Sequence, residues 1–362
     1  MRLLISKKYI LLIYILIGLF PFPFILDKIT PTPYTNQNTY NSNNPPHSYK
    51  NTCTVFTVTS EDDDKVYFCN NEDYFPNHMR MYFFPASEGK YGKVLYGFTY
   101  QHGFNPLGGM NEKGLSADEN WVPSTPVDRD SDKRDYNKNN FFTKALEKCA
   151  TVEDVIEYVE KFNLIYLESY PCQTHYADKT GDAAIIGVAK DGDIAITRKN
   201  NASYLLSTNF NVAHGRKPCW RYDLAKKELE NMDDDDVSKE NCLSILKATK
   251  QGKWTRYSNI NDLRKKKLYF YTSLTDYKGI AIVDLKKELA KGFHSYDILT
   301  LITRRGEVSP SPIFIASSII VLATIVAGCV LIWIRKIKPE IIKAKNSVEK
   351  RNGLNKGEYN EK

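Results

Sequence analysis

The most constraining feature of this 362-residue chain is an uncharged apolar segment near its C-terminus. Residues 313–334 contain no charged side chain and are long enough to cross the hydrocarbon core of a bilayer as a helix. Three cations follow the segment directly, and basic residues beside a span favour the cytoplasmic side. We therefore expect a transmembrane helix at residues 313–334 and a disordered basic cytoplasmic tail at residues 335–362. The residues before this helix are then expected to fold outside the cytoplasm.

A second apolar segment lies at the N-terminus. Residues 9–26 follow two lysines and contain two prolines, and no clear small-residue cleavage site comes after them. Residues 1–26 therefore fit a cleaved signal peptide and a retained signal anchor equally well. Residues 27–52 are rich in Asn, Thr, Pro and Tyr, which predicts a linker or propeptide. Membrane attachment through one or two spans is expected around an extracytoplasmic domain of residues 53–306.

The net charge of +7 is concentrated at the two ends of the chain. Residues 1–8 and 335–362 together carry +8, so the body between them carries −1. A nearly neutral body lacks the basic surface that nucleic-acid binding requires, and no nucleic-acid partner is expected. The sequence also lacks zinc-ligand spacing, a phosphate loop and a dinucleotide fingerprint, so neither a metal nor a cofactor is expected.

Strand and helix patterns in residues 53–306 predict a layered α+β domain. Thr151, with an acidic first turn after it, predicts a helix whose apolar stripe is Val152, Val155, Ile156 and Val159. Residues 296–303 are expected to form a turn. Strands are expected at residues 53–59, 65–69, 174–177, 183–189, 194–198, 204–208, 268–272 and 279–284. Further helices are expected at residues 222–232, 237–249 (capped by Asp236 or Ser238) and 284–292.

Cys53 is the first residue of the predicted domain and follows the linker directly. If the bond between Thr52 and Cys53 is cut, Cys53 gains a free α-amine beside its thiol. Such an amine has a reference pKa of about 7.7–8 and accepts a proton near neutral pH. Nucleophile and base then belong to one residue. Taken alone, however, a cysteine here is more often a buried strand residue or a disulfide partner.

Other cysteines allow disulfides in an extracytoplasmic domain. Cys149, Cys172, Cys219 and Cys242 could form one or two of them, with the pairing left open.

Seven sequence blocks follow one another after the linker. They are Cys53-Thr-Val-Phe, Asn-Asn-Glu-Asp-Tyr at 70–74, Gly-Gly-Met-Asn-Glu-Lys-Gly-Leu at 108–115, Thr-His-Tyr-Ala-Asp-Lys-Thr-Gly-Asp at 174–182, Ser-Thr-Asn-Phe at 207–210, Arg-Tyr at 221–222 and Tyr-Ser-Asn-Ile-Asn-Asp-Leu at 257–263. In this order the blocks resemble the linear amide C–N hydrolases of the N-terminal-nucleophile hydrolase superfamily. That family includes choloylglycine hydrolases, penicillin V acylase, isopenicillin N acyltransferases and acid-ceramidase-like enzymes. The resemblance extends from Cys53 to about residue 304.

The resemblance implies a four-layer αββα sandwich that cleaves linear, non-peptide C–N amide bonds. It places Cys53 at the family's nucleophile position and Asp73 at the acid beside the nucleophile's amine. Asn209 corresponds to an oxyanion-binding amide, and Asn120 to a second such donor if the alignment shifts by one residue. Arg221 corresponds to the active-site arginine that anchors the acid or orients the cysteine.

Two residues bear on specificity and on an alternative mechanism. Choloylglycine-type enzymes carry an Arg three residues before the motif Asp, whereas this chain has Asn70, so bile-salt specificity is not implied. His175 allows a Cys/His dyad, although its alternating-strand setting favours a structural role.

The sequence therefore predicts a hydrolase of small N-acyl amides that acts through a thioester on an autocatalytically exposed Cys53. One alternative is an acyltransferase on the same fold, in which an amine replaces water as the resolving nucleophile. The other is a catalytically inactive membrane-tethered binding ectodomain. The abundant aromatic residues, 24 Tyr and 17 Phe, allow an apolar acyl pocket without locating it.

Overall fold

The computed structural model describes residues 53–62, 64–73, 78–100, 103–305, 339–340 and 342–347. The expected signal segment or anchor, the linker and the transmembrane helix lie outside the described residues, as does most of the cytoplasmic tail. Within the described part of the chain, no helix has the length and apolar character needed to cross a membrane. The membrane spans therefore stay predictions.

The elements alternate between runs of strands and runs of helices. In chain order the strands are β1 (Thr54–Thr59), β2 (Val66–Asp73), β3 (Met79–Phe84), β4 (Lys93–Tyr100), β5 (Gly103–Asn111), β6 (Ser116–Trp121), β7 (Arg134–Asp135), β8 (Phe162–Asn163), β9 (Cys172–Ala177), β10 (Ala183–Val188), β11 (Ile194–Arg198), β12 (Tyr204–Ser207), β13 (Thr255–Asp262), β14 (Lys267–Tyr271), β15 (Ala281–Asp284) and β16 (His294–Asp297). The α-helices are α2 (Phe141–Lys148), α3 (Val152–Val159), α4 (Trp220–Glu230), α5 (Lys239–Thr249), α6 (Leu285–Leu289) and α7 (Ile298–Arg305).

Two large antiparallel sheets form the body of the domain. The six-stranded sheet has the order β12-β1-β2-β13-β14-β15, and the eight-stranded sheet has the order β11-β10-β9-β6-β5-β4-β3-β16. The short strands β7 and β8 pair in parallel outside both sheets. The first two strands of the domain therefore lie in the middle of the six-stranded sheet, where both have neighbours on either side.

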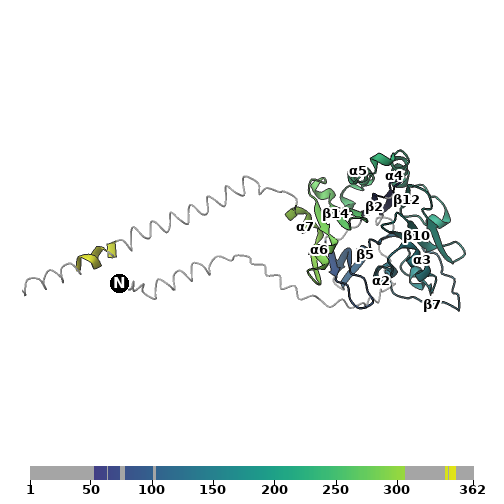
Figure 1. The fold of residues 1–362 in the computed structure, drawn as a ribbon, viewed down its shortest axis with the longest axis horizontal. Helices are drawn as coiled ribbons and strands as arrows, with labels where there is room; N and C mark the ends of the chain where they lie inside the picture. The colour runs from purple at the N-terminus through teal and green to yellow at the C-terminus, as the bar shows by residue number, and fades with distance from the viewer. Residues whose placement is uncertain are drawn as a thin grey trace, which may run out of the picture.

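Three clusters of buried apolar side chains define four layers. One lies between the sheets and includes Phe68 and Tyr96. A second joins the six-stranded sheet to α4 and α5, and a third joins the eight-stranded sheet to α2 and α3. In Figure 1, α4 and α5 lie together beside β2 and β12, whereas α2 and α3 lie beside β5 and β10. The order is helix, sheet, sheet, helix, so the predicted α+β sandwich is confirmed.

The helix that begins after Thr151 forms as predicted. The Thr151 side chain accepts a hydrogen bond from the Asp154 backbone, and the Asp154 side chain accepts one from the Thr151 backbone, which is a complete capping box. All four residues of the predicted stripe are buried. For the helix at α5, Ser238 rather than Asp236 is the N-cap.

Three stretches differ from the sequence predictions. The strand expected at residues 204–208 forms as β12, but it pairs with β1 in the other sheet, whereas the short turns before it favour a continuation of the β9–β11 meander. Residues 296–303 are not a turn: they end β16 and form most of α7, whose Ile298, Leu301 and Ile302 bury one apolar face. Residues 79–84, 93–100, 103–111 and 116–121, where the sequence predicts no element, form β3 to β6.

The six cysteines of the described residues carry free thiols, so the expected disulfides are not formed. Cys242 on α5 and Cys69 on β2 lie in the same buried cluster, where burial and then Cys242 raise the pKa of the Cys69 thiol. This pair was not predicted, because the two residues are brought together only by the packing of α5 on the sheet.

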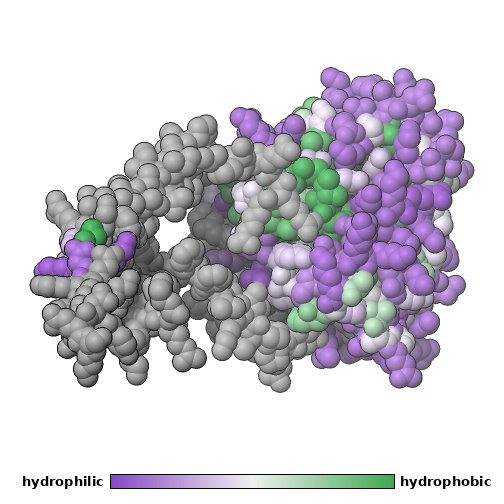
Figure 2. All heavy atoms as spheres, turned by 60° about the vertical axis from the view of Figure 1, so that its left-hand side comes forward, coloured by the Kyte–Doolittle hydropathy of each residue, from purple (hydrophilic) through white to green (hydrophobic). Residues whose placement is uncertain are grey.

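Figure 2 turns the side with α6, α7 and β14 toward the viewer and shows hydrophilic residues around a hydrophobic area. Large hydrophobic side chains exposed on the described residues include Leu274, Ile282 and Phe293. Cys53 is buried, so it does not belong to this surface.

Candidate active site

The β1–β2 hairpin brings Cys53 opposite Glu72. Thr54 pairs with Asn71, and the same register continued by one residue places Cys53 across from Glu72. The Cys53 thiol donates a hydrogen bond to Glu72 Oε1 at 3.2 Å. Cys53 is 6% and Glu72 2% exposed, so this contact is shielded from solvent. The resemblance to the linear amide C–N hydrolases implies no role for Glu72.

Asn209 flanks Cys53 from the other side of β1. Val55 pairs with Ser207 of β12, so the same register places Asn209 across from Cys53. The Asn209 side chain donates from Nδ2 to the Trp121 carbonyl at 2.8 Å. Cys53 therefore lies between a carboxyl group on β2 and an amide that follows β12.

Arg221 connects these residues from the first turn of α4. Its Nη1 donates to the Cys53 carbonyl at 2.6 Å and to Thr54 Oγ1 at 2.9 Å. Its Nη2 donates to Asn209 Oδ1 at 3.0 Å. The side chain is buried, and a guanidinium spreads several donors in one plane, so a single cation orients Cys53 and Asn209 together.

Asp73 lies on the helix-facing side of β2, opposite to the face that carries Glu72. Its Oδ2 is 4.0 Å from Arg221 Nη1 and accepts a hydrogen bond from Gln251 at 2.7 Å, while its Oδ1 accepts one from Thr255. Burial raises the pKa of Asp73 to about 6, although the bonds from Thr255 and Gln251 and the charge of Arg221 oppose this rise. The Asp73 carboxylate is thus linked to Cys53 through Arg221.

Asn120 on β6 has an unpaired amide group. Its Oδ1 accepts a hydrogen bond from Ser207 Oγ at 2.6 Å, whereas its buried Nδ2 has no hydrogen-bond partner within the described structure. A buried donor without a partner costs about 1–3 kcal/mol and is uncommon in folded proteins. Since Asn209 bonds to the carbonyl of Trp121, the residue after Asn120, this unpaired donor is in the same region as Cys53.

His175 takes part in a hydrogen-bonded chain that ends at Asn120. Its Nδ1 lies 3.1 Å from Ser207 Oγ, and its Nε2 lies 3.0 Å from Thr57 Oγ1. Burial lowers the pKa of His175 to about 3, so the ring is neutral. Because the Ser207 hydroxyl donates its proton to Asn120, it must accept a hydrogen bond from Nδ1–H of His175. Nε2 of His175 then carries no proton and accepts a hydrogen bond from the Thr57 hydroxyl. His175 contacts these hydroxyls instead of Cys53, so the Cys/His dyad is not formed.

A group of buried carboxyls surrounds the thiol. Asn70, at the position of the family's Arg, donates to Glu72 Oε2 at 3.3 Å and to Asp118 Oδ2 at 3.1 Å. Burial raises the pKa of Glu72 to about 8 and raises that of Asp118 well above its usual value. Burial, and then the charge of Glu72, raise the pKa of the Cys53 thiol. The thiol is therefore protonated at neutral pH in the uncut chain.

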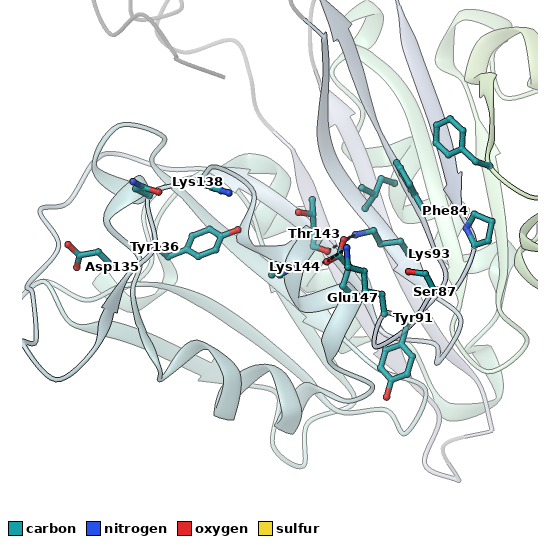
Figure 3. Close-up of a pocket in the computed structure, with 15 residues that line it drawn as sticks. Phe84, Ser87, Tyr91, Lys93, Asp135, Tyr136, Lys138, Thr143, Lys144 and Glu147 are labelled. Atoms are coloured by element: carbon teal, nitrogen blue, oxygen red, sulfur yellow. Dashed lines mark hydrogen bonds and ion pairs between the residues drawn. The ribbon is translucent and has the colours of Figure 1, made fainter. Parts of the chain in front are cut away.

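A separate cavity of about 690 Å³ lies beside α2. Figure 3 shows Lys93 reaching across it to Thr143 and Glu147, with Tyr91 and Tyr136 on its walls. Lys93 Nζ donates there to the Thr143 carbonyl at 2.8 Å and to Glu147 at 2.9 Å. None of the predicted site residues lines this cavity.

A family model described as acyl-coenzyme A:6-aminopenicillanic acid acyl-transferase matches residues 59–279. The chain belongs to this family. The predicted membership of the linear amide C–N hydrolase group is thereby confirmed. The matched range contains Asp73, Asn120, Asn209 and Arg221, whereas Cys53 precedes it by six residues.

Solved structures with the same fold share little sequence with this acyl-transferase family member. Penicillin V acylase from Agrobacterium tumefaciens is 20% identical, with a TM-score of 0.54 over 68% of this chain and 91% of that one. A variant of conjugated bile acid hydrolase from Clostridium perfringens is 18% identical, with a TM-score of 0.54 over 68% of this chain and 97% of that one. Among curated proteins, no sequence matches the chain. The likeness to these two enzymes establishes the fold.

Proposed function

We propose that the chain hydrolyses small N-acyl amides through a thioester on Cys53. The observation that carries the proposal is the set of hydrogen bonds from Arg221 to the Cys53 carbonyl and to Asn209, at the residue directly before strand β1. These bonds hold a nucleophile and an amide side by side. The names of the two similar solved structures, an acylase and a conjugated bile acid hydrolase, support an amide substrate.

The proposed reaction starts after the bond between Thr52 and Cys53 has been cut. The new α-amine takes the thiol proton, and the thiolate attacks the amide carbonyl of the substrate. The amine then gives the proton to the leaving nitrogen, and a thioester forms. Water, deprotonated by the same amine, hydrolyses the thioester and releases the acid.

The oxyanion of the tetrahedral intermediate needs hydrogen-bond donors. Asn120 supplies one, because its Nδ2 is buried and unpaired while its Oδ1 is held by Ser207. The Asn209 amide is the second donor in this proposal. One such donor is worth about 2.7–4 kcal/mol of transition-state stabilisation in comparable sites.

Asp73 and Arg221 orient Cys53 in this scheme. Arg221 binds the Cys53 carbonyl and lies within 4.0 Å of the Asp73 carboxylate. The negative charge of Asp73 favours the ammonium form of the new amine and keeps Arg221 in place.

The matching family model is described as an acyl-transferase, which favours a second candidate function. In that reaction an amine replaces water in the final step and a new amide is formed. Product analysis with and without an added amine separates the two: a hydrolase releases free acid in both cases, whereas an acyltransferase forms the new amide at the expense of acid.

The predicted membrane attachment adds a location to this proposal. If residues 313–334 cross the bilayer, the catalytic domain is held outside the cytoplasm and its substrates are N-acyl lipids or diffusible acylated molecules. Labelling intact cells with a membrane-impermeant lysine reagent should then modify the domain of residues 53–306. Labelling only after the membrane is permeabilised would contradict this location.

The hydrolase proposal is tested with a panel of N-acyl amino acids, conjugated bile acids and penicillin V. The wild-type protein should release acid from at least one class, and Cys53→Ala should abolish this release. Cys69→Ala is the matched control, because Cys69 is a buried thiol of the same sheet that contacts Cys242 rather than the site. Undiminished hydrolysis by Cys53→Ala would refute the proposal.

A further inference from the structure

Glu72 is the closest carboxyl group to the Cys53 thiol, yet the proposed hydrolysis does not use it. The 3.2 Å bond between Sγ and Oε1 joins the candidate nucleophile to a group that is able to accept a proton. In the proposed hydrolysis the α-amine of Cys53 is the base, and this amine exists only after the chain is cut. In the uncut chain the nitrogen of Cys53 is an amide and cannot act as the base.

We propose that Glu72 is the general base of the self-cleavage that exposes Cys53. This inference rests on the proposed function, in which Cys53 must become an N-terminal residue. Glu72 is thereby assigned to maturation of the chain, and the α-amine to turnover of the substrate.

The cleavage step balances with the atoms of this chain and one water. The Glu72 carboxylate takes the proton from Sγ, and the thiolate attacks the carbonyl carbon of Thr52. As the C–N bond breaks, Glu72 returns the proton to the nitrogen of Cys53, and Thr52 is held as a thioester on Sγ. Water then hydrolyses this thioester, which leaves a carboxylate on Thr52 and restores the thiol beside a free amine.

The contacts of Glu72 suit this role. Asn70 donates to Oε2 at 3.3 Å, so one oxygen is held while the other faces the thiol. The carboxyl lies between the two sheets and is 2% exposed, so bulk solvent does not compete with the thiol for its proton. Its pKa of about 8 is close to neutrality, where a group is able both to accept and to return a proton.

Burial is the main cause of the raised pKa of Glu72, and the charge of Asp73 adds to it. The titratable groups that interact with it in the described structure are Cys53 before β1, Asp73 on β2, Asp118 and Glu119 on β6, and Tyr257 on β13. None of them supplies a positive charge, and the effects that lower the pKa of Glu72 are its hydrogen bonds to Cys53 and Asn70. Asp73 has Arg221 as its own partner on the other face of β2.

The test compares self-cleavage of the full chain with Glu72→Gln, Glu72→Asp and Glu119→Gln. Newly synthesised protein is sampled over time at pH 6 to 9, and the chain that starts at Cys53 is quantified by intact mass. We expect wild-type cleavage to accelerate as the pH rises through about 8. Glu72→Gln should cleave at least 100-fold more slowly without this acceleration, since general bases contribute about 10²- to 10⁴-fold. Glu72→Asp should keep part of the rate.

Glu119→Gln is the matched control. Glu119 is an equally buried carboxyl that lies beside Cys172 rather than Cys53, and its substitution is also isosteric. This variant should cleave within a few-fold of wild type. Cleavage of Glu72→Gln at the wild-type rate would overturn the inference, and so would equal losses in both variants.

A second experiment separates maturation from turnover. In the full chain, residues 49–52 are replaced by a factor Xa recognition sequence, so that the added protease exposes Cys53. Protease-cut Glu72→Gln should then recover at least a third of the N-acyl amide hydrolysis of protease-cut wild type. If only the wild-type protein becomes active, the inference fails while the proposed function stands. If protease-cut wild type is itself inactive, the proposed function fails, and the inference fails with it.

Discussion

Replacing Arg221 with methionine tests how the site is held together. Met has a similar length but supplies no hydrogen-bond donor and no charge. In the wild-type protein Arg221 is 4% exposed and bonds to the Cys53 carbonyl, Thr54 and Asn209, 4.0 Å from the fully buried Asp73. Arg221→Met therefore leaves a buried carboxylate without its cation.

The expected cost follows from this burial. Removing one partner of a buried ion pair destabilises a protein by about 3–5 kcal/mol. For a domain of this size each kcal/mol lowers the melting temperature by about 2–4 °C, so Arg221→Met should melt roughly 6–20 °C below wild type at pH 7.5.

The cost should also depend on pH. Burial raises the pKa of Asp73 in the folded state to about 6, and the charge of Arg221 lowers it. The pKa of Asp73 is higher in the folded state than the value of about 3.8 in the unfolded state. Asp73 therefore stabilises the fold fully below pH 3.8, and this stabilisation is lost as the pH rises through 6. Without Arg221 the folded pKa rises further, so ionised Asp73 costs more in the variant. The deficit of Arg221→Met should therefore be larger at pH 7.5 than at pH 4.

Urea unfolding followed by circular dichroism at the two pH values measures this deficit. Arg216→Met is the matched control, because Arg216 pairs with Asp223 on the surface and such pairs contribute at most about 1 kcal/mol. If Arg221→Met loses no more stability than Arg216→Met, Arg221 does not stabilise the site in this way. An equal deficit at both pH values would show that the loss of stability does not come from ionised Asp73.

Two further substitutions test the oxyanion donor and the close backbone packing. Asn120→Ala should lower kcat of protein with an exposed Cys53 by about 10²- to 10³-fold with KM nearly unchanged, measured by steady-state kinetics, and an unchanged kcat would exclude Asn120 as a donor. Gly114→Ala should lower the free energy of unfolding by at least about 2 kcal/mol, because φ is +88° and the added Cβ would lie 2.6 Å from the Leu263 carbonyl oxygen. Gly292→Ala, with φ +84° and open space around the new Cβ, should cost only about 1–2 kcal/mol in the same denaturation assay, so equal losses would contradict the packing argument.

Elements whose signals are local were predictable from the sequence. The helix after Thr151 has its cap, its acidic first turn and its apolar stripe within nine residues, and it forms as predicted. Strand β13 lacks such a signal, because its sequence Thr-Arg-Tyr-Ser-Asn-Ile-Asn-Asp is mostly polar. Its stability depends on distant partners: Asn261 donates to the Tyr96 hydroxyl at 3.0 Å and to Ser116 at 2.9 Å.

In the candidate site, too, some residues were predictable from the sequence and others depend on tertiary contacts. The order of the sequence blocks was sufficient to select Arg221 and its two neighbours Asn209 and Asp73 as site residues. Glu72 was missed because a motif assigns roles by position, whereas its contact with Cys53 depends on the register of the β1–β2 hairpin. Counting outward from the acidic turn would have placed the two residues opposite each other. The unpaired Nδ2 of Asn120 has no sequence signal, since it depends on how Ser207 orients the amide.

The proposed function requires Cys53 to act as an N-terminal nucleophile. It is tested most directly by acid-quenching the active protein during turnover of an N-acyl amide and determining its mass and its first residue. We expect a mature chain that begins at Cys53 and carries the acyl group of the substrate on that residue. A fully active protein whose bond between Thr52 and Cys53 is intact would contradict it.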